Sequence, residues 1–223
     1  MSRARSDLPW EGRAERADLL CLGGIVASGL YGLLLLPAVP ALVGTHPMLL
    51  ELLRGSMTSM VTMGALARTG HASLLVAVAA GLPGTMMFDW LYWWAGRRWG
   101  SRALQMLLGR HPRAAKRMAL VRRLSGRWGW LGVVSAYLLP IPSVLIYAAV
   151  GWAGMGLAAF LVFDAIGALL WVVLLVGLGY AIGQGAVDVA HAVSHYALAV
   201  SLALVAAVVA RQAWLARRDA ERT

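Results

Sequence analysis

Long apolar runs, separated by short polar stretches, occupy most of the chain. They cover approximately residues 19–43, 47–70, 72–95, 128–154, 155–182 and 193–213. An α-helix needs about 20 predominantly apolar residues to cross the hydrocarbon core of a bilayer. The pattern therefore predicts an all-α integral membrane protein, a polytopic helical bundle whose first and last transmembrane helices lie at 19–43 and 193–213.

Two of the apolar runs contain residues that are unsuitable for a simple lipid-exposed helix. The run at 47–70 carries Glu51 and Arg54 among several Gly, Ser and Thr residues. The run at 128–154 carries Pro140 and Pro142, which remove backbone donors and break a helix. Broken backbone at membrane depth is tolerated only where it is buried in protein or lines a wet cavity. We therefore predict two re-entrant helical hairpins; an ordinary kinked span is the alternative for the second.

The distribution of positive charge favours the same topology. Residues 97–127 contain ten Arg or Lys residues and no Asp or Glu. If every run crossed the membrane from a cytoplasmic N-terminus, this basic loop would lie outside, against the positive-inside tendency. If the two hairpins enter and leave by one face, the loop, the segment 1–18 and the tail 214–223 are all cytoplasmic. We expect this second arrangement, in a cell (inner) membrane.

The two hairpins also suggest an internal repeat. Each is followed by a span that ends in a G-x-x-x-G pair, Gly96–Gly100 in the first case and Gly179–Gly183 in the second. The crossing count makes the two hairpin-plus-span units point in opposite senses, which is the inverted-repeat architecture of many secondary transporters. Close packing of helices is a simpler explanation for each glycine pair.

The composition excludes several other classes of protein. The 223 residues are 60% hydrophobic and 13% charged, with a net charge of +10 and a mean hydropathy of +0.70. The positive charge lies beside membrane segments, so we expect it to contact anionic lipid and not nucleic acid. The single cysteine, Cys21, permits no internal disulfide. His191 and His195 alone do not make a metal site, so we expect no metal or cofactor.

A family resemblance is carried by two groups of residues. The first group comprises the stretch 64–70 with Asp89, Tyr92, Gly96, Arg97 and Gly100, and the second comprises 139–142 with Gly151, Gly154, Met155, Phe160, Asp164, Gly167 and Trp171. These residues resemble those of the DedA family of membrane proteins, whose domain is also called the VTT or SNARE-associated Golgi protein domain. The resemblance covers about residues 45–185.

The resemblance implies an inner-membrane protein with two facing re-entrant hairpins. Family members are linked to movement of undecaprenyl phosphate and phospholipids between leaflets, with proton coupling proposed in bacteria. The family commonly has an acidic residue about seven positions before the glycine that matches Gly64, where this chain has Ser56 and Met57. It also tends to place arginines three residues on either side of the proline that matches Pro140, where this chain has Tyr137 and Ser143.

Charged residues inside the predicted membrane segments are the candidate site residues, because intramembrane charge is costly. Glu51 and Arg54 are spaced to pair on a helix, either as a proton-titrating carboxylate beside a phosphate-binding cation or as a structural pair. Asp89 can bond to a broken hairpin end or carry protons. Asp164 has no nearby cation in sequence, and Arg68 or a hairpin N-terminus is its expected partner. Arg68 can otherwise contact lipid phosphate or extend to the interface.

From these features we expect a translocase that moves an anionic lipid through a cavity between the two hairpins. The chain has no nucleophile elbow, no phosphate-binding glycine loop before Lys-Ser/Thr and no paired-carboxylate arrangement near a basic catalyst, so we expect that it is not an enzyme. A non-transporting scaffold of the same fold and a small-solute transporter are the alternatives. The expected partners are membrane lipids, and a homo-oligomer is compatible with the sequence.

Overall fold

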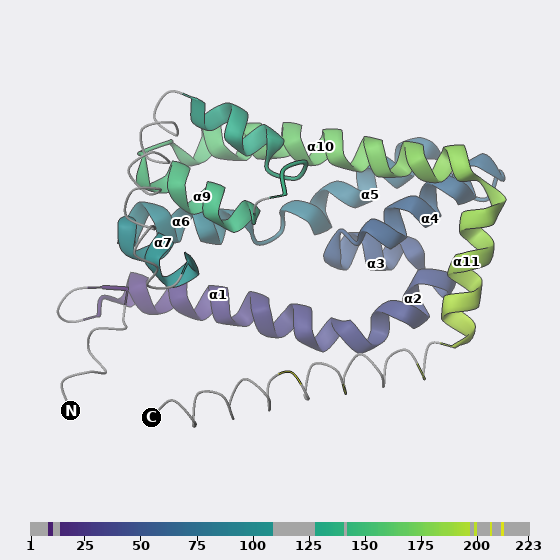
Figure 1. Ribbon diagram of the computed structural model, residues 1–223, viewed down its shortest axis with the longest axis horizontal. Coiled ribbons are helices and arrows are strands. Elements are labelled where there is room, and N and C mark those ends of the chain that lie inside the picture. The colour runs from purple at the N-terminus through teal and green to yellow at the C-terminus, as the bar shows by residue number, and fades with distance from the viewer. Residues whose placement is uncertain are drawn as a thin grey trace. The chain divides into compact units, whose positions relative to one another are not determined.

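The computed structural model describes residues 9–10, 14–108, 128–140 and 142–196, together with the single positions 199, 206 and 211. Within these ranges the regular structure is entirely helical (Figure 1). The chain divides into two compact units. Unit 1 comprises residues 1–28 and 85–172, and unit 2 comprises residues 29–84 and 173–223. The prediction of an all-α protein is therefore confirmed for the described part of the chain.

The described helices occupy most of the described ranges. They are α1 (Arg16–Leu35), a 3₁₀ turn (Leu36–Ala38), α2 (Val39–Thr45), α3 (Pro47–Arg54), α4 (Met57–Arg68), α5 (Leu74–Met86), α6 (Asp89–Trp99), α7 (Ser101–Leu108), α9 (Ser143–Trp152), α10 (Leu157–Ile182) and α11 (Gln184–His195). Residues 128–135 form a further helical segment before α9.

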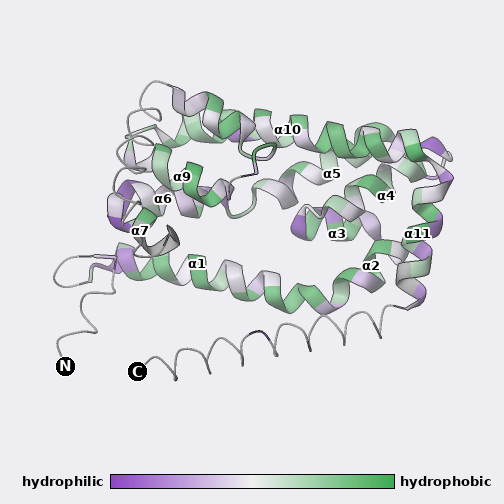
Figure 2. Ribbon diagram, viewed as in Figure 1, coloured by the Kyte–Doolittle hydropathy of each residue, from purple (hydrophilic) through white to green (hydrophobic). Residues whose placement is uncertain are grey.

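Three stretches of the described chain are long and apolar enough to cross a membrane. They are Arg16–Thr45, Leu74–Trp99 and Leu157–Ile182, and Figure 2 shows α1 and α10 as predominantly hydrophobic along their lengths. Large apolar side chains on these helices are exposed, among them Leu34 (70%) and Leu75 (78%). Such exposure is costly in water and is expected where lipid covers the helix. The protein is a membrane protein; its predicted last span at 193–213 lies mostly outside the described residues.

The span Leu74–Trp99 contains a break that the apolar pattern did not predict. It consists of α5 and α6, separated by the turn at Met87 and Phe88. Pro83 lies inside α5. A proline inside a helix removes one backbone hydrogen bond and clashes with the carbonyl four residues earlier, and α5 ends three residues beyond it. The break places Asp89 in the first turn of α6.

Both predicted hairpin regions contain the expected interruption of the helix. In unit 2, α3 ends at Gly55, whose φ of 59° is in the left-handed region that glycine adopts readily, and α4 begins two residues later. In unit 1, the helical segment 128–135 is followed by turns and bends over 136–140. Pro142 directly precedes α9.

Backbone contact between helices in unit 1 depends on two glycines. A Cβ added to Gly96 of α6 would lie 1.9 Å from the carbonyl oxygen of Ala148, and one added to Gly151 of α9 would lie 2.1 Å from that of Trp93. Only glycine permits so close an approach. The α6–α9 pair packs beside a core that includes Trp93, Tyr147 and Phe160.

Unit 2 contains the equivalent contact between α4 and α10. A Cβ added to Gly64 would lie 2.0 Å from the carbonyl oxygen of Val176, and one added to Gly179 would lie 1.9 Å from that of Val61. In both units, therefore, the second helix of a predicted hairpin packs through a glycine pair against a span-forming helix. Close helix packing, the simpler of the two explanations of Gly96 and Gly179, is present in the structure.

Helix α11 is an element that the sequence pattern did not predict. It follows α10 after Gly183, whose φ is 67°, and it contacts α2 and α4 within unit 2. Its sequence mixes polar and apolar residues, including Gln184, Asp188 and His191, so it does not resemble a membrane-spanning run.

Candidate functional site

The first candidate site, in unit 1, is a pair of carboxyl groups joined by one tyrosine. The hydroxyl of Tyr137 lies 2.6 Å from Oδ2 of Asp89 and 3.1 Å from Oδ1 of Asp164. Asp89 begins α6 after the break at 87–88, Tyr137 lies in the turn between the two helices of the predicted hairpin, and Asp164 lies two turns into α10. Two breaks in the helices thus bring three polar side chains together.

Several polar atoms of this cluster are buried without a partner. The side chain of Asp164 is fully buried, and its Oδ2 makes no hydrogen bond to any described residue. The same is true of the hydroxyl of Tyr147, whose ring packs edge-on against Phe160 at 5.3 Å. Asp89 and Tyr137 are half-buried.

The chemistry of this cluster follows from counting protons. A tyrosine hydroxyl carries a single hydrogen, so Tyr137 donates to one of the two carboxyl groups at a time. Within the described ranges no ion pair to either carboxyl is formed. Buried carboxylates require compensation by a hydrogen-bond donor, a proton or a cation. The cluster is therefore suited to hold and exchange a proton.

The second candidate site is Glu51 in unit 2. Its side chain is fully buried, and neither carboxyl oxygen has a hydrogen-bond partner in the described chain. Glu51 lies in α3 where this helix touches α5, since a Cβ added to Gly84 would lie 2.1 Å from the Glu51 carbonyl oxygen. Burial of a carboxyl group without a partner lowers the stability of the protein. A carboxyl group in such surroundings is therefore a candidate functional group by default.

The predicted pairing of Glu51 with Arg54 is not formed. Arg54 is exposed, and its Nη1 donates to the carbonyl oxygen of Gly32 at 3.2 Å. Arg54 is the last residue of α3 and lies next to the left-handed Gly55. Glu51 is fully buried whereas Arg54 is exposed and bound to another helix, so the two side chains point apart although they lie three residues apart in α3.

Arg68 is also not the partner of Asp164. Its Nη1 donates to the carbonyl oxygen of Tyr180 at 3.3 Å, and its guanidinium lies 5.7 Å from the centre of the Tyr180 ring. A Cβ added to Gly183 would touch the Arg68 side chain at 2.8 Å. Arg68 thus fixes the end of α4 to the end of α10, and Asp164 instead accepts a hydrogen bond from Tyr137.

The remaining residues of the resemblance have structural positions that explain them. Gly64, Gly96 and Gly151 permit the backbone contacts described above, and Gly100 and Gly154 adopt positive φ of 56° and 95° at the ends of α6 and α9. Tyr92 packs against the core of unit 1. Arg97 is exposed at the last turn of α6. Pro140 and Pro142 lie at the interruption before α9.

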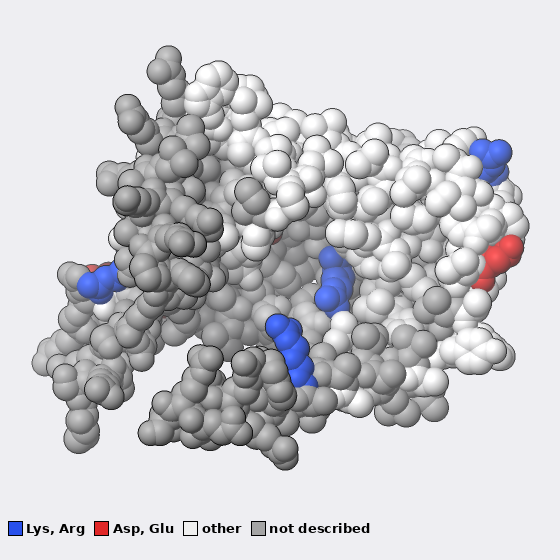
Figure 3. Space-filling model, viewed as in Figure 1, with Lys and Arg blue, Asp and Glu red and all other residues white. Residues whose placement is uncertain are grey.

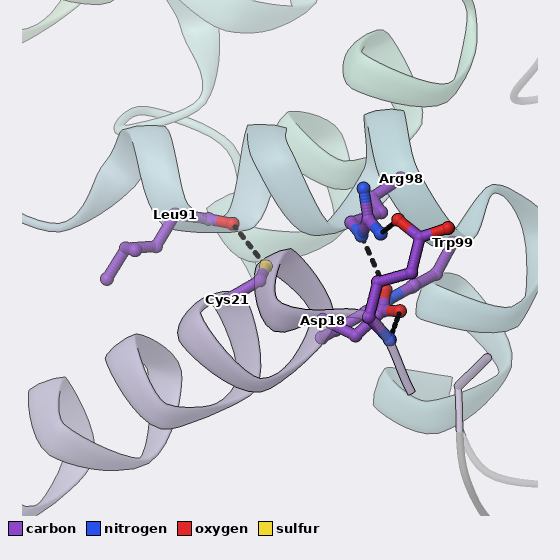
Figure 4. Close-up of polar contacts among 6 residues, drawn as sticks. Asp18, Cys21, Leu91, Arg98 and Trp99 are labelled. Carbon is purple, nitrogen blue, oxygen red and sulfur yellow. Dashed lines mark hydrogen bonds and ion pairs between the residues drawn. The ribbon is translucent and has the colours of Figure 1, made fainter. Parts of the chain in front are cut away.

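A second polar cluster in unit 1 was not predicted. Arg98 forms ion pairs with Glu15 and with Asp18, the latter at 2.5 Å, and Asp18 also accepts from Nε1 of Trp99 at 2.9 Å (Figure 4). The nearby thiol of Cys21 faces the carbonyl oxygen of Leu91. The sequence suggested only that Asp18 belongs to an N-terminal segment and Arg98 to a basic loop, because residues 80 positions apart show no local signal of contact.

Charge is scarce elsewhere on the described surface. On the face drawn in Figure 3 the described charged side chains are few, and most of the described surface is uncharged. This agrees with a lipid-covered protein whose polar groups are gathered inside or at the ends of its helices.

Comparison with known proteins identifies the family. The model of the VTT domain matches residues 54–181, more than half of the chain, and this range includes Asp89, Tyr137 and Asp164 but not Glu51. No curated protein and no solved structure matches the chain. The chain therefore belongs to the VTT-domain family, the family of the DedA membrane proteins.

Proposed function

We propose that this protein moves an anionic lipid between the leaflets of the cell membrane and couples this movement to protons held by its buried carboxyl groups. The observation that carries the proposal is the shared hydroxyl of Tyr137 between Asp89 and Asp164. Intramembrane carboxyl groups commonly mark proton or substrate pathways. Membership of the DedA family supports the same function.

The proposed topology follows from the helix interruptions. We propose that α3–α4 and the segment 128–135 with α9 enter and leave the membrane by one face each, as inverted hairpins. Both termini and the basic residues 97–127 are then cytoplasmic. The recurrence of the glycine contact in each unit supports a repeat of this kind.

The test is leaflet exchange in reconstituted vesicles. Fluorescent undecaprenyl phosphate and fluorescent phosphatidylglycerol are placed in one leaflet, and their loss from that leaflet is followed with and without a proton gradient. Asp89→Asn, Asp164→Asn and Glu51→Gln remove an ionisable group while keeping the side-chain size. We expect each to reduce exchange to the protein-free rate and to abolish its dependence on the gradient.

The matched control is Asp188→Asn. Asp188 is an exposed acid on α11 that accepts from Gln184 at 2.9 Å, so its replacement removes one carboxylate without touching either candidate site. Exchange at the wild-type rate in the three buried variants would contradict the role of these carboxyl groups. Absence of any exchange by the wild-type protein would favour the alternative of a non-transporting scaffold.

A further inference from the structure

Unit 1 contains a polar cavity that is separate from the candidate site. It has a volume of about 710 Å³ and lies where the ends of α1, α6, α7 and α9 meet. Cavities of about 300–1,000 Å³ are typical of sites for small ligands. Its lining combines cations with aromatic side chains: Arg97, Arg98, Arg102, Trp10, Trp99 and Trp152.

The charges in this cavity are unequally compensated. Glu15 and Asp18, which also line it, both bind Arg98. Asp18 is buried, with 4% of its surface exposed, and its carboxylate is held by Arg98 and Trp99. Both acids of the lining are thus engaged by Arg98, and within the described chain Arg97 makes no ion pair.

Arg97 has room to reach a ligand. It is exposed, and because Gly154 has no side chain its guanidinium lies against the end of α9, where an added Cβ would be 3.3 Å from Nη1. Guanidinium groups bind phosphate oxygens through two parallel hydrogen bonds, which makes arginine well suited to phosphate.

The position of the cavity along the helices indicates the class of ligand. Arg97, Arg98 and Trp99 are the last residues of the candidate span Leu74–Trp99, and Asp18 is near the start of the candidate span Arg16–Thr45. The end of a span is the depth at which tryptophans concentrate and at which lipid phosphates lie. Anionic headgroups are therefore the anions that this cavity meets at the highest local concentration.

We propose that this cavity binds the phosphate group of an anionic phospholipid, with Arg97 and Arg102 as its cationic contacts and the three tryptophans beside the glycerol and the first part of the acyl chains. Arg98 keeps the shape of the site through its acids. This binding does not require lipid translocation, and it involves none of the carboxyl groups of the candidate site.

The experiment measures bound lipid directly. Purified protein in detergent is offered equal amounts of phosphatidylglycerol and phosphatidylcholine, and native mass spectrometry counts the bound molecules. Because each basic residue near a lipid surface contributes roughly a fivefold preference for anionic lipid, we expect Arg97→Gln and Arg102→Gln each to lower the preference about fivefold and the double variant to lower it about 25-fold.

Two further variants separate the site from general charge and from misfolding. Arg16→Gln removes an exposed cation at the start of α1, which does not line the cavity, and should leave the preference unchanged. Arg97→Lys keeps the positive charge and should retain most of the preference for phosphatidylglycerol. An unchanged preference in the double variant would overturn the proposal, and so would an equal loss in Arg16→Gln.

Soluble phosphate is distinguished in a third arm. Glycerol 3-phosphate or inorganic phosphate, added at the concentration of the lipid, should not displace phosphatidylglycerol. Displacement would assign the cavity to a soluble phosphate and overturn the lipid assignment. Leaflet exchange is measured separately. If the wild-type protein binds the lipid in this cavity but does not exchange it, only the proposed function is contradicted. If it exchanges the lipid but the cavity variants bind it as the wild type does, only this site is contradicted.

Discussion

Two tyrosines of unit 1, ten residues apart, differ in how they meet the carboxyl groups around them. Tyr137 donates its hydroxyl hydrogen to Asp89 or Asp164, whereas the buried hydroxyl of Tyr147 lies beside the same groups without a hydrogen bond of ordinary geometry in the described chain. Their rings are 6.5 Å apart. The two residues therefore provide a matched pair for measuring what the shared hydrogen bond contributes.

Tyr137→Phe should destabilise the protein by roughly 1–3 kcal/mol, because it leaves buried carboxyl oxygens without their donor. Tyr147→Phe removes a hydroxyl that lies beside the same carboxyl groups but forms no hydrogen bond of ordinary geometry with them, so it should cost clearly less. Denaturant titration of the detergent-solubilised protein measures both free energies of unfolding. Equal losses in the two variants would show that the Tyr137 hydroxyl has no special role.

At the scale of elements, glycine determines which helices touch. Gly179 of α10 faces the backbone of α4, whereas Gly177, two residues earlier in the same helix, has no atom within 4 Å of an added Cβ. The contrast between neighbouring glycines shows that α10 is pressed against α4 on one face only. In unit 1 the contact of Gly96 with α9 has the same geometry.

Gly179→Ala should lower the free energy of unfolding by roughly 1–3 kcal/mol, the usual cost of overpacking, because its Cβ would overlap the Val61 carbonyl. Gly177→Ala should be neutral or should stabilise α10 by about 0.5–1 kcal/mol, since alanine favours a helix more than glycine. The two variants are compared by the same unfolding titration. A loss in Gly177→Ala as large as that in Gly179→Ala would exclude backbone contact as the cause.

At the scale of the whole molecule, features set by the local sequence could be predicted, whereas contacts between residues far apart in the chain could not. The apolar runs and the breaks near Gly55 and Pro140 were predictable, because hydrophobicity and backbone chemistry act locally. The partner of Asp164 and the contact of Arg98 with Asp18 were not, since they join residues 27 and 80 positions apart. Charge alone makes Asp89 and Asp164 candidates, whereas Tyr137 is uncharged and the sequence marks it only as the residue that replaces an arginine of the family.

The proposed topology predicts the reactivity of single cysteines at exposed Thr45 and Ser73 and at Ser125 in the basic loop. Cysteines at 45 and 73 should react with an impermeant maleimide added to intact cells, and a cysteine at 125 should react only after permeabilisation. The natural Cys21 is fully buried and should remain unlabelled in the folded protein. Labelling at 125 in intact cells would place the arginine-rich loop outside and contradict both hairpins.

The ion pair between Asp18 and Arg98 has a consequence for biosynthesis. Asp18 leaves the ribosome 80 residues before the cation that neutralises it. During that interval Asp18 lacks the guanidinium that binds it in the folded protein, and the contact of the first helix with α6 is without its ion pair. Nascent chains stopped before residue 98 should therefore hold their first helix loosely and be degraded sooner than chains stopped just beyond it.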